Sequence, residues 1–487
     1  MIDDLADPRL LRTDLYIDGA WTAAQSGARS PVRDPATGAA IAECARGGTA
    51  DAERAVQAAK AAMRDWSALA AKERSAVLRR WHDLVVENAD DLARILTAEQ
   101  GKPLAEARGE ILYGAAFFEW YAEEAKRVYG ETIPAPKPDQ RMMVLRQPIG
   151  VCAAITPWNF PMAMIPRKAA PALAAGCAMV LKPASATPFS ALALAELADR
   201  AGVPAGVFSV VPGSAVDVGE YLVRHEDVRK VTFTGSTEIG RRLMALAAPT
   251  IKKLSLELGG NAPVLVFDDA DLDVAVAGAL ASKFRNAGQT CVCANRIYVQ
   301  SGIYDAFAEK FGAAVSALTV GDGREAGVEI GPLIDEDAVQ KVEAHIADAL
   351  ERGGRLVAGG ARHERGGRFF QPTVVAEADA GMAVAREETF GPLAPLFRFE
   401  TEKEAVAAAN DTEYGLAAYL FARDNARIWR VSEALEFGIV GVNAGITSYE
   451  GAPFGGVKAS GLGREGSHLG IDEFLETKYV CIGEVHA

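Results

Sequence analysis

Two segments of the sequence carry residue types that suit acyl chemistry on an aldehyde. Cys291 lies in the segment 284–293, where small and amide side chains surround it. Upstream, Glu257 precedes a Leu-Gly-Gly turn, which presents a carboxylate that can serve as a base. A cysteine that forms a thioester needs such a base, because water must be activated to hydrolyse the ester. The two residues together predict an enzyme.

Cys293 follows Cys291 by two residues and predicts a redox role. In an extended chain the Cα atoms of such a pair lie about 7 Å apart. A disulfide between them therefore forms only where the backbone curls. Such a bond would protect Cys291 from irreversible oxidation by peroxide.

The segment 231–241 predicts a phosphate-binding turn. It reads as a buried strand, a turn at Gly235 and Ser236, and the start of a helix. Backbone N–H groups at a helix N-terminus bind phosphate, and the Ser236 hydroxyl adds a donor. An ordinary turn is the alternative, although its position at a strand end favours the phosphate. The literal G-x-G-x-x-G at 461–466 has no apolar strand before it and is predicted to be a loop.

Two further strand ends carry candidate binding residues. Asn159 is held between Pro157 and Pro161 directly after an expected strand. Its amide could donate to a developing oxyanion or could cap a turn. Lys182 and Ser185 follow another strand and suit a ribose or its phosphate, with a solvated lysine as the alternative.

Two arginines predict a substrate with a carboxylate of its own. Arg285 precedes the cysteine segment, and Arg167 lies shortly after Asn159. Burying an arginine costs free energy unless a carboxylate pairs with its charge. The pair therefore suits a clamp for the distal carboxylate of a semialdehyde. The alternative is that either arginine pairs with an internal Asp or Glu.

The elements that position these residues predict an α/β fold. A hairpin is expected at 15–21, and helices are expected at 49–67, 72–97 and 104–127. Short apolar strands then alternate with helices, which indicates a doubly wound parallel sheet, and the strands are expected at 151–155, 178–181, 207–211, 230–234 and 253–258. A second α/β pattern follows up to about 461. A Pro-rich stretch and a strand at 142–145 suit an arm that leaves the domain, and the tail from 470 alternates again.

Composition excludes several classes of partner. The 487 residues carry 51 Lys+Arg against 65 Asp+Glu, a net charge of -14, which repels nucleic acid and anionic lipid. The longest uncharged run, 147–166, contains four prolines, which exclude a membrane-spanning helix. Six scattered cysteines and an acidic start predict a cytoplasmic protein. No metal site is expected.

A series of motifs, in order along nearly the whole chain, resembles the aldehyde dehydrogenase superfamily. The motifs are Pro-Trp-Asn-Phe-Pro at 157–161, Lys-Pro-Ala at 182–184, Phe-Thr-Gly-Ser at 233–236, Glu-Leu-Gly-Gly at 257–260, Gly-Gln-Thr-Cys at 288–291, Glu-Glu-Thr-Phe-Gly-Pro at 387–392 and Pro-Phe-Gly-Gly at 453–456. Within the superfamily, the segments 165–168, 284–293 and 461–467 are most similar to the succinate-semialdehyde dehydrogenases.

The resemblance implies a role for each matching residue. Cys291 would attack the aldehyde, Asn159 and the Cys291 N–H would hold the oxyanion, and hydride would pass to a nicotinamide. Glu257 would then deprotonate the water that hydrolyses the thioester. Further residues match family positions near the cofactor or the substrate: Pro157, Trp158, Glu388 at the nicotinamide ribose, Phe390 near the ring, and Ser448 beside the substrate.

The resemblance also implies cofactor, domains and assembly. Many NAD-specific members carry Glu where this chain has Ser185, so NADP is expected to be favoured over NAD. The expected division is an NAD(P)-binding domain (1–127 and 148–260), a catalytic domain (261–461) and a β oligomerisation arm (128–147 and 470–487). The arm would join subunits of a homo-oligomer, a dimer or a tetramer.

The expected reaction is oxidation of succinate semialdehyde to succinate. Glutarate semialdehyde is the nearest alternative substrate, since a clamp does not by itself fix chain length. A CoA-acylating enzyme is disfavoured because Glu257 supplies a hydrolytic base. A catalytically silent scaffold is disfavoured because Cys291, Glu257 and Asn159 are all present.

Overall fold

The first half of the chain, together with one strand from near residue 461, builds an eight-stranded sheet with a parallel centre. The computed structural model describes residues 2–485, and the strand order in this sheet is β19-β11-β10-β7-β8-β9-β1-β2. The parallel strands are β7 (Val151–Ile155), β8 (Met179–Lys182), β9 (Phe208–Val210), β10 (Val228–Thr234) and β11 (Lys253–Glu257). The predicted doubly wound sheet is confirmed, with strand ends shifted by one or two residues. Antiparallel strands close its edges: β1 (Leu15–Ile17), β2 (Ala20–Thr22) and β19 (Gly461–Leu462).

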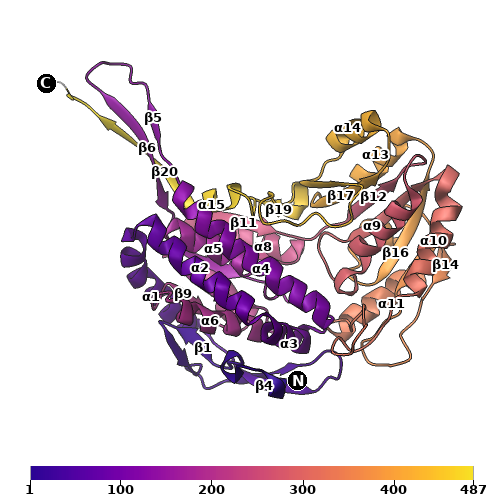
Figure 1. The fold of residues 1–487 in the computed structure, drawn as a ribbon, viewed down its shortest axis with the longest axis horizontal. Coiled ribbons are helices and arrows are strands. Elements are labelled where there is room, and N and C mark those ends of the chain that lie inside the picture. The colour runs from indigo at the N-terminus through magenta and orange to yellow at the C-terminus, as the bar shows by residue number, and fades with distance from the viewer. Residues whose placement is uncertain (1, 486–487) are drawn as a thin grey trace.

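Helices cover both faces of this sheet (Figure 1). They are α1 (Thr49–Ala68), α2 (Ala71–Glu87), α3 (Ala89–Gln100), α4 (Leu104–Glu124), α5 (Pro166–Ala175), α6 (Phe189–Ala201), α7 (Tyr221–Arg224) and α8 (Thr237–Ala247). The single helix expected at 72–97 is wrong, since it divides at Asn88. The Asn88 amide donates to the Leu84 carbonyl at 2.7 Å, and this local bond competes with the helix backbone.

A second sheet of seven strands follows. Its order is β14-β15-β16-β13-β12-β17-β18, and all neighbours are parallel except β14 and β15. The strands are β12 (Ala262–Val266), β13 (Ala294–Gln300), β14 (Arg355–Ala358), β15 (Thr373–Ala378), β16 (Leu393–Phe399), β17 (Ala417–Phe421) and β18 (Ile439–Val442). Its helices are α9 (Leu272–Phe284), α10 (Tyr304–Ser316), α11 (Glu336–Glu351), α12 (Ala383–Arg386), α13 (Glu402–Asn410) and α14 (Asn425–Ala434). The strands β12 and β17 are buried on both faces, which accounts for their continuous apolar sequences.

Two smaller sheets complete the fold. The strands β5 (Glu131–Ile133), β6 (Arg141–Pro148) and β20 (Leu475–Ile482) form an antiparallel arm that projects from the first body, as Figure 1 shows. The short helix α15 (Leu469–Asp472) leads into β20, and β3 (Arg29–Arg33) pairs with β4 (Ala40–Ala45). Within residues 2–485, no helix combines the length and apolarity needed to cross a membrane.

The two large sheets meet at a short link between β11 and β12. The last residue of β11 is Glu257, and β12 begins at Ala262 in the other sheet. Parallel strands present their carboxyl ends at one edge, where ligands bind in open α/β sheets. The link therefore carries Glu257 to the space between the two sheets.

Candidate active site

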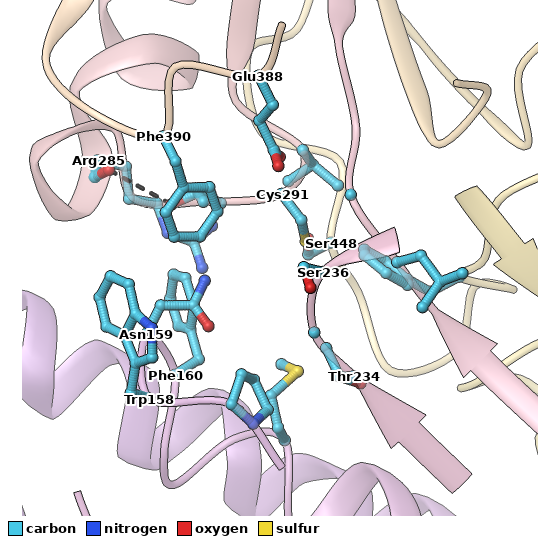
Figure 2. A pocket seen from close by; sticks show the side chains of 18 of the residues that line it. Trp158, Asn159, Phe160, Thr234, Ser236, Arg285, Cys291, Glu388, Phe390 and Ser448 are labelled. Carbon is cyan, nitrogen blue, oxygen red and sulfur yellow. Dashed lines mark hydrogen bonds between the residues drawn. The ribbon is translucent and has the colours of Figure 1, made fainter. Parts of the chain in front are cut away.

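A cavity of about 280 Å³ lies between the two sheets. Its walls come from the loop after β7, the end of β10, the link after β11 and the segments before β13 and β16. Figure 2 shows that side chains from these distant segments face one cavity. The lining includes most of the residues expected from the sequence: Pro157, Trp158, Asn159, Arg167, Gly235, Ser236, Arg285, Cys291, Glu388, Phe390 and Ser448.

Cys291 lines the cavity with its thiol half-buried. Burial raises the pKa of this thiol to about 12; Glu388 and Glu257 add to the rise, and Arg167 opposes it. The resting group is therefore a thiol rather than a thiolate. Since the thiolate is the stronger nucleophile, attack on a carbonyl requires a proton acceptor nearby.

Asn159 presents one free amide hydrogen to the cavity. Its Nδ2 donates to the Gln289 carbonyl at 2.9 Å, which fixes the plane of the side chain. The second hydrogen of this amide has no acceptor among the described residues. An amide held in this way can donate to an oxygen that gains negative charge on a substrate beside Cys291.

Glu257 is buried behind the cavity wall rather than in it. The wall contains its neighbours Leu258 and Gly259 but not its own side chain. Neither carboxylate oxygen has a hydrogen-bond partner among residues 2–485. Burial and the neighbouring Glu465 raise the pKa of Glu257 well above its ordinary value. The side chain is untethered and has a high proton affinity.

Glu388 is a second carboxylate, and it does line the cavity. Its Oε1 accepts the Gly260 N–H at 3.1 Å. Burial raises the pKa of Glu388 to about 7, although this N–H bond and nearby lysines oppose the rise. Unlike Glu257, this side chain is held in place by a backbone donor.

The end of β10 forms the expected turn. Ser236 is the N-cap of α8, and its hydroxyl accepts the Ile239 N–H at 3.4 Å. Across the cavity, the rings of Trp158 and Phe390 meet edge to face, with centroids 5.6 Å apart. Phe390 has a φ of 53°, a strained value for an aromatic residue that is typical of functional sites. A strand end, a helix N-terminus and an aromatic pair together fit a dinucleotide.

Lys182 and Ser185 lie outside this cavity. Ser185 lines a separate hollow of about 160 Å³, where its hydroxyl donates to the Gly213 carbonyl at 3.2 Å. Lys182 is buried, and its ammonium donates only to the Pro183 carbonyl at 3.1 Å. Burial lowers the pKa of Lys182 to about 8. Within residues 2–485 this cation has no carboxylate partner. An anionic ligand could therefore pair with its charge.

The two arginines differ in their partners. The Nη2 of Arg167 lies 2.9 Å from Glu465 Oε2, and Lys168 contacts the same carboxylate. The internal-pair alternative is thus realised for Arg167. This approach lacks hydrogen-bond geometry, so the Nε and Nη2 of Arg167 keep unused donor capacity. Arg285 stacks over the Phe160 ring at 4.7 Å and has no ion-pair partner among the described residues.

Cys293 is buried, and its sulfur already has two polar contacts. Its thiol donates to the Gly288 carbonyl at 3.3 Å, and the buried Lys283 ammonium lies 3.8 Å from its sulfur. Burial raises the pKa of this thiol. The redox role of Cys293 therefore stays a prediction, since its sulfur would have to leave both contacts.

Sequence reasoning missed Lys341 and Glu465. Lys341 lines the cavity from α11, and its ammonium donates to the Glu388 carbonyl at 2.6 Å. Glu465 lies in the glycine-rich segment 461–466, whose first two residues form β19 beside Glu257. That segment is an edge strand followed by a loop, so it is not a dinucleotide turn. No spacing rule marks either residue, because both depend on long-range contacts.

Comparisons with known proteins agree with this geometry. The model of the Aldehyde dehydrogenase family matches residues 21–480. The succinate-semialdehyde dehydrogenase [NADP(+)] GabD of Escherichia coli is 64% identical, covering 98% of this chain and 99% of that protein. The glutarate-semialdehyde dehydrogenase of Pseudomonas aeruginosa is 62% identical, covering 99% and 100%. The crystal structure of succinate-semialdehyde dehydrogenase from Burkholderia pseudomallei superposes with a TM-score of 0.98 at 61% identity, covering 99% and 100%.

The order of the matching motifs, the cavity between two α/β sheets and a family match over most of the chain lead to one conclusion. The chain belongs to the aldehyde dehydrogenase family and is an aldehyde oxidoreductase.

Proposed function

We propose that this enzyme oxidises an aldehyde with a distal carboxylate, and that succinate semialdehyde is its substrate. One observation carries the proposal: Arg285 lines the same cavity as Cys291 and has no ion-pair partner within residues 2–485. A half-buried guanidinium without a carboxylate partner is stabilised by an anionic ligand. Ser448 and Arg167 line the same cavity.

The acylation step follows from the positions of Cys291 and Asn159. The Cys291 sulfur adds to the aldehyde carbon while its proton passes to a base, giving a thiohemiacetal. The free amide hydrogen of Asn159 and the Cys291 N–H donate to the oxygen, which gains negative charge. The cofactor supplies the acceptor for the hydride that leaves this carbon. A thioester on Cys291 remains.

Hydrolysis of the thioester is assigned to Glu257. With no hydrogen bond to hold it, the carboxylate is free to turn from behind Leu258 toward Cys291. There it accepts a proton from water as the water attacks the thioester carbon. A raised pKa makes Glu257 a stronger base for this transfer than an exposed glutamate.

The residues near the strand ends fit NADP or NAD, with NADP favoured. Gly235 and Ser236 would hold the pyrophosphate, Glu388 the nicotinamide ribose, and Pro157, Trp158 and Phe390 would flank the ring. Lys182 offers a cation without a carboxylate partner, and Ser185 offers a neutral hydroxyl in place of an acid. Both suit a 2′-phosphate. The E. coli relative is named as NADP(+)-dependent, which supports this assignment.

Glutarate semialdehyde is the second candidate substrate. A larger cavity of about 680 Å³ adjoins the first, and the two share Tyr113, Phe160, Arg285 and Ser448. An extra methylene therefore has room near the arginine. The relative from P. aeruginosa carries the name of that activity.

The expected domains, assembly and compartment complete the proposal. We assign 1–127 and 148–260 to cofactor binding, 261–461 to catalysis, and 128–147 with 470–487 to contact between subunits. The arm exposes apolar side chains, among them Ile133, Leu145, Tyr479 and Ile482, which supports a homo-oligomer. All six cysteines are free thiols, which supports a cytoplasmic location.

A panel of initial rates tests the proposal. Succinate semialdehyde, glutarate semialdehyde, uncharged propanal and cationic betaine aldehyde are each assayed with NAD and with NADP. We expect kcat/KM to be highest for a semialdehyde, lowest for betaine aldehyde, and higher with NADP. Equal values for propanal and both semialdehydes would contradict the carboxylate clamp, and no turnover of any aldehyde would indicate a silent scaffold.

A further inference from the structure

Lys102 is a buried cation that contacts the backbone of Asn159. It lies between α3 and α4, far from Asn159 in sequence, and is 2% exposed. Its ammonium donates to Glu110 Oε2 at 2.6 Å and to the Asn159 carbonyl at 2.8 Å. It also lies 3.8 Å from the centre of the Phe160 ring. One side chain thus holds two consecutive residues of the loop after β7.

Glu110, the partner of Lys102, holds the next part of the same loop. Its other oxygen, Oε1, accepts the N–H groups of Met162 and Ala163 at 2.9 and 3.1 Å. The pair is fully buried, with both side chains 1% exposed. One ion pair therefore anchors the loop at Asn159 and again at Met162 and Ala163.

A second set of bonds reaches the Asn159 carbonyl from the cysteine segment. Asn286 Nδ2 donates to that carbonyl at 3.0 Å, and Asn286 Oδ1 accepts from Gln100 Nε2 at 2.9 Å. Gln100 Oε1 in turn accepts the Lys102 N–H at 3.0 Å. The Asn159 carbonyl thus receives two donors, one from each side of the cavity, and both belong to one connected network.

Stability alone does not account for a buried ion pair at this place. Desolvating both charges costs about as much as their attraction returns, so apolar residues would serve a purely structural purpose equally well. The contacts instead fix the backbone of a residue whose amide must point at one atom. We propose that Lys102 is a positioning residue that holds the Asn159 amide in its oxyanion-binding orientation. This inference rests on the proposed function, in which Asn159 is the oxyanion donor.

The test replaces the ion pair without leaving a lone charge. Lys102→Met alone would bury an unpaired carboxylate and destabilise the fold, so it is combined with Glu110→Gln. The amide oxygen that Glu110→Gln introduces can still accept the Met162 and Ala163 N–H groups, while the ammonium on the Asn159 carbonyl is lost. We expect kcat for succinate semialdehyde to fall about 10- to 100-fold, because small misplacements of a catalytic group have effects of that size. The KM of the aldehyde should change less than about threefold, since neither side chain lines the cavity that contains Cys291.

A double-mutant cycle with Asn159→Ala separates positioning from general damage. If Lys102 acts through Asn159, the Lys102→Met/Glu110→Gln pair should lower kcat less than about threefold in the Asn159→Ala background. Lys230→Met combined with Glu473→Gln is the matched control, since Lys230 is also fully buried and pairs with Glu473 at 3.2 Å, and neither residue lines the cavity. It should lower the melting temperature and leave kcat near that of the wild type.

The outcomes are distinguishable. Losses that multiply in the cycle, or an equal loss of kcat in Lys230→Met/Glu473→Gln, would overturn the positioning role and leave the proposed function standing. An Asn159→Ala enzyme with unchanged kcat would overturn the positioning role and the oxyanion role of Asn159 together, because the amide would then have no catalytic part. A loss of kcat that disappears without the Asn159 amide would support the inference.

Discussion

Two buried glutamates on either side of the cavity have opposite surroundings. Glu110 and Glu257 are each 3% exposed. Glu110 accepts three hydrogen bonds, one from the Lys102 ammonium and two from backbone N–H groups. Glu257 accepts none among the described residues. The same side chain at the same depth is fixed in one region and free in the other.

This difference indicates what each carboxylate does. A buried carboxylate whose oxygens both accept hydrogen bonds is held in one place. The carboxylate of Glu257 has no such bonds and a raised pKa, both of which suit a group that accepts a proton during the reaction. The difference supports the proposal that Glu257 is the proton acceptor and that Glu110 anchors the loop after β7.

Glu257→Gln should produce the largest effect on activity. Acylation and hydride transfer should continue, but hydrolysis should slow by about 10²- to 10⁴-fold because the water loses its base. Rapid-mixing measurements should then show a burst of reduced cofactor near one per active site, followed by slow turnover.

Glu388→Gln is the matched control for that experiment, since Glu388 also carries a raised pKa beside Cys291. This variant should weaken cofactor binding and give no burst. A burst in Glu388→Gln but not in Glu257→Gln would assign the base to Glu388 instead.

Glu110→Gln should have the largest effect on stability. The substitution leaves the Lys102 cation without its carboxylate, which costs about 3–5 kcal/mol of unfolding free energy for a buried pair. Denaturant unfolding measures this loss, and adding Lys102→Met should recover most of it. An unfolding free energy unchanged by Glu110→Gln would mean that the ion pair is not buried in solution.

Glu257→Gln should have a contrasting effect on stability, and it should depend on pH. Because the folded state raises the pKa of Glu257, it binds the proton more tightly than the unfolded chain does. Wild-type stability should therefore decrease as pH rises from about 4.5 toward the raised pKa. Glu257→Gln should remove this part of the slope, and an unchanged slope would contradict the raised pKa.

The arginines extend the comparison to cations. Arg285→Ala should lower kcat/KM for succinate semialdehyde about 30- to 1,000-fold, the value of a charge-assisted contact of about 2–4 kcal/mol. Propanal, which never uses that contact, should be oxidised almost as before. Arg167 pairs with Glu465, so Arg167→Ala should impair both substrates and lower the melting temperature. An equal loss of kcat/KM for both aldehydes in Arg285→Ala would contradict the proposed carboxylate clamp.

The smallest expected effect concerns Lys182. Its titration should make the binding of NADP depend on pH. Burial lowers the pKa of Lys182 to about 8, so the cation is lost above that pH. The Kd of NADP should then rise by up to about tenfold per pH unit, while the Kd of NAD stays nearly constant. Lys182→Arg, which remains charged, should bind NADP independently of pH between about 7 and 9. A similar pH dependence in this variant would point to another group.

Local signals in the sequence predicted most of the fold and most of the residues that line the cavity. The strands around 151–258 are apolar runs that end in Gly, Pro or Thr, and the parallel sheet follows from that alternation. The division at Asn88 was missed because a single side-chain bond decides it. The sequence also did not predict the contacts of Arg167 and Lys102. The partner of Arg167, Glu465, is distant along the chain, and Lys102 resembles any polar residue between two helices.

The arm has a consequence for how the chain is made. Its middle strand β6 is complete at Pro148, but its partner β20 begins only at Leu475, far later in the chain. At about 5–20 residues per second, a ribosome needs roughly 15–65 s to produce what lies between. During that time one edge of β6 is unpaired and could join the strand of a neighbouring nascent chain. Arg141, Arg146 and Pro148 on β6 are residue types that oppose such pairing, so the nascent chain is protected until β20 has been made.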